Sequence, residues 1–132
     1  SSVIRALAGV FGGLALTMIM VFVLQGIGHE MYPPPTDIDP EDREAFAAAV
    51  AAMPLMALVM VLVSYALGTF TGAWLAARVG GRPFYAFLVG GVMTLAGMQN
   101  LIAVPHPLWF TVAGTLVFLP SAWFASRVAT YE

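Results

Sequence analysis

The stretch GHEMYPPPTDIDPEDRE, residues 28–44, decides how this chain is organised. It holds every acidic residue of the protein except Glu132, and long runs without any charge lie on both sides of it. The 132-residue sequence is 61% hydrophobic and only 9% charged, whereas soluble domains carry about 25% charged residues. We therefore predict an integral membrane protein in which this stretch is one of the few segments that lie in water.

Four apolar runs are long enough to cross a bilayer, which takes about 20 residues in a helix. The first run resembles a secretory signal, but it is too long for one and no clean cleavage site follows it, so we expect it to be retained. The predicted fold is an all-α, four-transmembrane-helix bundle forming a single domain. Its spans are expected at about residues 3–28, 53–77, 84–103 and 108–129.

The arginines predict the direction of the spans. All but one of the five basic residues fall at span ends on one side of the membrane, whereas the acids of residues 28–44 fall on the other side together with Arg43. Arginine in short loops favours the cytoplasmic side. We therefore expect cytoplasmic N and C termini, on the side of Arg5, Arg78, Arg82 and Arg127.

The external segment, residues 29–52, is expected to have internal order. Prolines at 33–35 cannot continue a helix and favour an extended conformation. The sequence DPED at 39–42 then offers an acidic N-cap, a proline at the first helical position and acids in the first turn. We predict a short interfacial helix from Pro40 to Met53, with Pro54 beginning or kinking the second span.

The inner ends of the second and fourth spans are alike, GAWLAARV at 72–79 and SAWFASRV at 121–128. A duplication would give two tandem hairpins that run in parallel and are related by an axis along the membrane normal. Convergence is the alternative, because tryptophan and arginine are common at inner membrane boundaries. We favour an internal repeat.

Small residues recur at four-residue spacing on three of the spans. In lipid such residues let helix backbones approach closely, so they indicate helix–helix contacts, either within the chain, as we expect, or with a second copy. Pro120 predicts a kink in the fourth span. The predicted packing residues are Gly9, Gly13, Ser121 and Ala125, together with Ser64, Gly68, Gly72 and Ala76, which we call the small-residue stripe.

Both histidines of the chain fall in external turns beside prolines. Imidazole is a common metal ligand and a carboxylate can complete a shell, so His29, His106 and Glu30 form a candidate metal or redox site. Against it, the sequence has no HxxxH or HxxE spacing. We predict no cofactor, with a metal ion as the open alternative.

Neutral polar residues form a second candidate site. Gln99 and Asn100 are adjacent in the outer half of the third span, and Tyr65 lies within the second. Buried amides need partners, so these residues either bond across helices or face a polar pocket open to the outside. No ionisable side chain lies in the middle of a span, which disfavours ion-coupled transport.

The composition excludes several kinds of chemistry. The chain has no cysteine and no lysine, which rules out disulfides, thiolate metal sites and Schiff bases, and no basic patch is large enough for nucleic acid. Ser64 and Ser121 have no base near them in the sequence. We therefore predict no catalytic residue and consider an enzyme the less favoured hypothesis.

The pattern of GHEMYPPP, an acid-rich helix start and PHPLW resembles a group of short, uncharacterised bacterial inner-membrane proteins. The residues that carry the resemblance are Gly28-His29, Tyr32-Pro33-Pro34 and Pro105 to Trp109. It implies four spans in the bacterial cytoplasmic membrane and no particular activity.

Three hypotheses for function follow. The first is a protein that acts through helix contacts, as a homodimer or as an accessory subunit of a membrane complex, which predicts that the small-residue stripe faces lipid in the monomer. The second is a small transporter or lipid-binding protein, which predicts a cavity that reaches Asn100. The third is a metal or redox protein, which predicts that the rings of His29 and His106 converge.

Overall fold

The computed structural model describes residues 1–33, 37–39 and 41–131, and within them the chain contains helices and no strand. The predicted four-helix transmembrane bundle is confirmed, because α1, α3, α4 and the run formed by α5 and α6 are each long and apolar enough to cross a membrane. The helices are α1 (Ser2–Met31), α2 (Arg43–Ala51), α3 (Leu55–Gly80), α4 (Pro83–Ala103), α5 (Leu108–Leu116) and α6 (Phe118–Val128).

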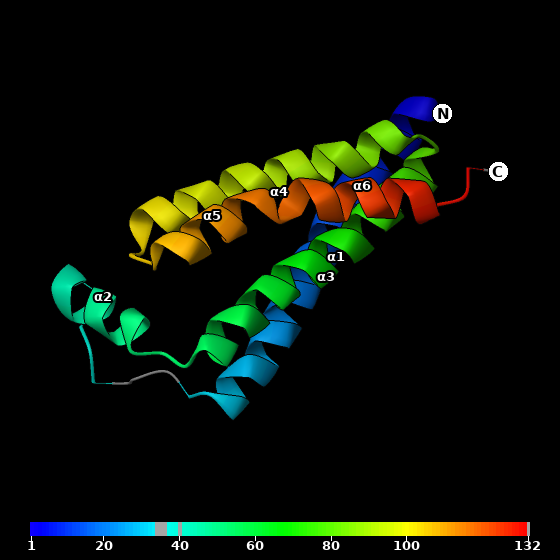
Figure 1. The fold of residues 1–132 in the computed structure, drawn as a ribbon. Coiled ribbons are helices and arrows are strands. Elements are labelled where there is room, and N and C mark those ends of the chain that lie inside the picture. Colours follow the sequence, from blue (N-terminus) through cyan, green and yellow to red (C-terminus); the bar gives the residue numbers. More distant parts are fainter. Residues whose placement is uncertain (34–36, 40, 132) are drawn as a thin grey trace.

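The four spans are arranged as two arms (Figure 1). Helices α1 and α3 lie side by side and form the first arm, and α4 forms the second arm together with α5 and α6. The arms meet where both chain termini lie and diverge toward the opposite end, where α2 lies between their tips. We call these two ends the terminal end and the open end.

The first arm is held by close backbone approach between α1 and α3. A Cβ atom added to Gly9 would lie 2.8 Å from the Ala76 carbonyl oxygen, and one added to Gly68 would lie 2.7 Å from Cγ2 of Val21. Helices come this close only where one of them presents no side chain, and in lipid van der Waals packing is what stabilises such a pair. The small-residue stripe is therefore buried against α1 of the same chain and does not face lipid.

The two arms join through a core of small residues at the terminal end. Ala73 and Ala76 of α3 and Ala122 and Ala125 of α6 are fully buried in one cluster. These alanines belong to the two similar segments, 72–79 and 121–128, which thus occupy comparable positions on α3 and α6. The packing around them is unequal, because α4 packs on α3 whereas α1 does not pack on α6 within the described residues. The internal repeat stays a prediction.

Two arginines donate hydrogen bonds to carbonyl groups near the C-termini of helices. At the terminal end, Nε of Arg5 donates to the Val79 carbonyl at 3.1 Å, next to the left-handed Gly81 that ends α3 with a φ of 81°. At the open end, Nη1 of Arg43 donates to the carbonyl of Ala103, the last residue of α4, at 3.1 Å. Positive charge is favoured at both places by the helix dipole.

The start of α2 differs from the prediction. The helix begins at Arg43 and not at Pro40, with Asp42 as the N-cap whose carboxylate accepts from the Ala45 amide at 3.1 Å. The Asp39 carboxylate accepts instead from the Glu41 amide at 2.9 Å, so it closes a turn before the helix. Pro40 and the prolines at 34 and 35 lie outside the described residues.

The first span also ends later than expected, at Met31. Tyr32 follows outside the helical region, with φ of −133° and ψ of 80°, and it is the residue before Pro33. A residue that precedes proline is disfavoured in the helical region. The C-terminal end of α1 is thus set by Pro33, and His29 belongs to the last turn of the helix and not to the loop.

The fourth span is interrupted close to Pro120, with Val117 between α5 and α6. Proline has no amide hydrogen, so the Leu116 carbonyl receives no helical bond from residue 120. The next bond, from the Ser121 amide to the Val117 carbonyl, is stretched to 3.4 Å, and the Ser121 hydroxyl donates to the same carbonyl at 2.8 Å. Just after the break, Phe118 is buried against Tyr65 of α3, with 5.3 Å between ring centroids.

Candidate ligand pocket between the arms

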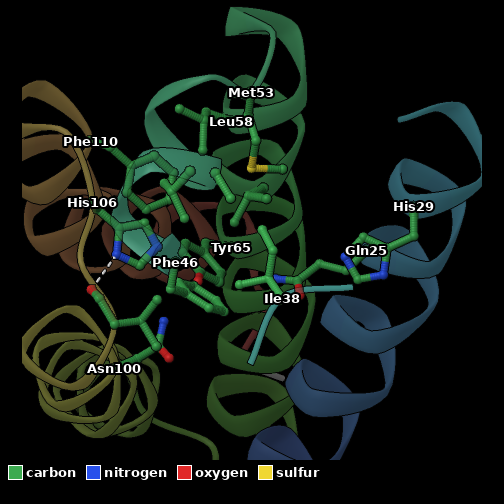
Figure 2. Close-up of a pocket in the computed structure, with 14 residues that line it drawn as sticks. Gln25, His29, Ile38, Phe46, Met53, Leu58, Tyr65, Asn100, His106 and Phe110 are labelled. Atoms are coloured by element: carbon green, nitrogen blue, oxygen red, sulfur yellow. Dashed lines mark hydrogen bonds between the residues drawn. The ribbon is translucent and has the colours of Figure 1, made fainter. Parts of the chain in front are cut away.

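A cavity of about 390 Å³ lies between the arms at the open end (Figure 2). Side chains from α1, α2, α3, α4 and α5 line it, as do residues of the connecting segments. Pockets that bind small molecules are usually concave, mostly apolar and about 300–1,000 Å³ in volume. The cavity therefore has the size of a small-molecule site.

The wall beneath α2 is apolar. Val50 of α2, Leu58 of α3 and Phe110 of α5 are buried in one cluster, and Phe46 and Met53 pack against it. Among the described residues, the backbone of α2 does not come close to that of any other helix. Helix α2 is thus a cover that is held in place by its side chains and by the hydrogen bond from Arg43 to Ala103.

Five polar side chains face the cavity from both arms: Gln25 and His29 of α1, Tyr65 of α3, Asn100 of α4, and His106 of the turn after α4. The side-chain amide of Gln25 donates to the Ser64 hydroxyl at 3.3 Å, which ties α1 to α3 beside the cavity. No acidic or arginine side chain is found among the described lining residues. The lining therefore offers hydrogen bonds without formal charge when both imidazoles are neutral.

The ring of His106 is held in one orientation. Its Nδ1 lies 2.7 Å from the Val104 carbonyl oxygen, and its face stacks on the buried ring of Phe110, with 4.8 Å between centroids and 13° between planes. A carbonyl oxygen can only accept, so Nδ1 carries the hydrogen in this contact and Nε2 of the neutral ring is left as an acceptor. Figure 2 shows the ring between the Val104 segment and the interior of the cavity.

The predicted polar pocket is present with one exchange of residues. Asn100 and Tyr65 line the cavity, whereas Gln99, which is exposed as Asn100 is, does not. Neighbouring residues of a helix point about 100° apart, and the rotation of α4 turns Asn100 and not Gln99 toward this cavity. Gln25 takes the place of Gln99. Its sequence signal is a single amide near the C-terminal end of the first, largely apolar span.

The predicted metal residues are brought together only in part. His29 and His106 both line the cavity, but from opposite arms, and Figure 2 shows them on opposite sides of it. Glu30 is exposed and does not line the cavity. Within the part of the chain that the structure describes, no group of three or more His, Cys, Asp or Glu side chains is placed to hold a metal ion. Of the three candidate metal residues, only the two histidines line the cavity, and they do so from opposite arms.

Comparisons with protein-family models, with curated proteins and with solved structures find no match to this chain.

Proposed function

We propose that this protein binds a small, uncharged molecule at the membrane surface, as a lipid-binding protein or a small transporter. The observation that carries the proposal is the cavity itself, about 390 Å³ between the arms, with an apolar wall and five hydrogen-bonding side chains. A cavity that reaches Asn100 is what this hypothesis requires. A filled bundle would have argued against it.

The charges support an orientation for this pocket. Arg5, Arg78, Arg82 and Arg127 belong to the terminal end, and the acidic residues 37–44 belong to the open end. The positive-inside rule then favours cytoplasmic termini in a bacterial inner membrane. In this orientation the pocket lies toward the external face, and its ligand arrives from the outer leaflet or from the outside.

A function through helix contacts has less support. The small-residue stripe, which was the candidate surface for a homodimer or for a larger membrane complex, is covered by α1 of the same chain. The exposed apolar residues along the spans suit the lipid bilayer as partner. A second copy or another subunit would need a different surface.

The test is to fill the cavity and look for loss of the ligand. Ala49→Trp places a large ring on the α2 wall of the cavity, and Leu95→Trp is the control, because Leu95 is 70% exposed on α4. Native mass spectrometry of each protein, extracted gently from its own membranes, measures bound mass. We expect a small molecule on the wild type and on Leu95→Trp and none on Ala49→Trp. Retention by Ala49→Trp, or a bare chain in all three samples, would contradict the proposal.

A further inference from the structure

The most specific chemical feature of the cavity is the Nε2 atom of His106. The ring cannot readily turn, because Nδ1 is bonded to the Val104 carbonyl, the face is stacked on Phe110, and Pro105 and Pro107 restrict the backbone on both sides. Among the described residues, Nε2 has no hydrogen-bond partner. The protein thus presents a fixed, unused acceptor in a half-buried position at the cavity.

An acceptor of this kind selects for a donor. A ligand that carries a hydroxyl or an N–H group can pair with Nε2, whereas an analogue without a donor leaves the nitrogen desolvated and unpaired. Sites built to hydrogen-bond a ligand's hydroxyl discriminate against such analogues far more strongly than apolar pockets discriminate by size.

With both imidazoles neutral, the rest of the lining disfavours a charged ligand. The described lining residues include no arginine to balance an anion and no carboxylate to balance a cation, and burying an unpaired charge is costly. The apolar cluster of Val50, Leu58 and Phe110 instead provides a surface for a hydrocarbon chain.

Resting on the function proposed above, we infer that the ligand is an uncharged amphiphile whose hydroxyl or N–H group donates to Nε2 of His106, with its hydrocarbon part against the apolar wall beneath α2. His106 is then the residue that determines specificity. Gln99, which is exposed on α4 and does not line the cavity, serves as the control.

The experiment uses two photoreactive probes of equal chain length, a primary decyl alcohol with a diazirine in the chain and its methyl ether. Each is added to the full chain in lipid nanodiscs, and labelled residues are mapped by mass spectrometry. We expect the alcohol to label the cavity residues of α2 and α5 about tenfold more than the ether, because the ether leaves the acceptor unpaired.

Variants separate the role of Nε2 from that of the fold. His106→Phe keeps a ring to stack on Phe110 but removes the acceptor, so labelling by the alcohol should fall to the level of labelling by the ether. Labelling by the ether should persist, which reports an intact cavity. His106→Gln, whose amide oxygen can accept, should restore part of the preference, and Gln99→Phe, outside the cavity, should leave it unchanged.

The outcomes distinguish this inference from the proposed function. Equal labelling by both probes in the wild type, abolished by Ala49→Trp, would overturn the role of His106 and leave the pocket in place. A preference that survives His106→Phe, or is lost in Gln99→Phe, would likewise overturn it. Absence of cavity labelling by either probe would overturn both proposals.

Discussion

Gly9 and Gly26 lie on the same helix, yet the space beside them differs completely. At Gly9 an added Cβ would lie 2.8 Å from one backbone atom of α3 and 2.9 Å from another, whereas at Gly26 it would meet nothing within 4 Å. Backbone atoms cannot turn aside as a side chain can. At the residue scale, the closeness of α1 and α3 thus depends on particular glycines and not on glycine content as such.

This difference predicts opposite effects for the same substitution. Alanine is favoured over glycine in a helix by about 1 kcal/mol, so Gly26→Ala should raise the free energy of unfolding slightly. Gly9→Ala gains the same helix-propensity energy. Its added methyl group must also push two packed helices apart, and such overpacking costs about 1–3 kcal/mol. We expect a net loss for Gly9→Ala, measured by circular dichroism during unfolding in sodium dodecyl sulfate. Equal shifts in both variants would contradict the close packing seen at Gly9.

At the scale of secondary-structure elements, α2 stands apart from the spans. It has its own N-cap in Asp42, and it covers the pocket through Phe46 and Val50 without backbone contact to other helices in the described structure. Its hydrogen bond from Arg43 to Ala103 links this cover to the second arm, in addition to the apolar cluster that Val50 shares with Phe110. An element that is held by so few contacts is expected to open first.

Removal of that link should make α2 open more often. A hydrogen bond from a charged donor contributes about 1.5–3 kcal/mol when buried and less at an exposed site such as this one, so Arg43→Ala should speed amide hydrogen exchange in α2 about fivefold. Arg82→Ala at the terminal end is the control, because Arg82 is also exposed but lies far from α2 along the spans. Unchanged exchange in Arg43→Ala would show that the apolar side chains alone hold α2.

At the scale of the whole molecule, the two arms diverge from a shared core of alanines and leave the pocket at the other end. The arginines and the acidic residues are segregated to these two ends, and the proposed direction in the membrane depends on this segregation.

The absence of cysteine makes that direction directly measurable. Glu41→Cys and Arg82→Cys each introduce one thiol at an exposed position, at the open and the terminal end respectively. In intact bacterial cells, a membrane-impermeant maleimide should label Glu41→Cys, and it should label Arg82→Cys only after the inner membrane is permeabilised. The reverse pattern would place the pocket on the cytoplasmic side.

The number of spans, their approximate limits and the packing role of the small residues could be predicted from the sequence by itself, because hydrophobic length and the four-residue spacing are local properties of each helix. Pro33 and Pro120 likewise act on their own neighbours, and their effects are visible as a helix end and a helix break. The candidate pocket could be predicted only in outline. Asn100 and Tyr65 were identifiable as polar residues within spans.

The tertiary structure alone decided which polar residues meet. The rotation of α4 about its axis turns Asn100 and not Gln99 toward the cavity, and the pairing of α1 with α3 brings Gln25 beside Ser64. The burial of the small-residue stripe within the chain and the position of the two histidines on opposite arms have the same cause. They depend on how helices distant in the sequence pack against one another, and close packing in lipid is a property of pairs of surfaces that no single segment contains.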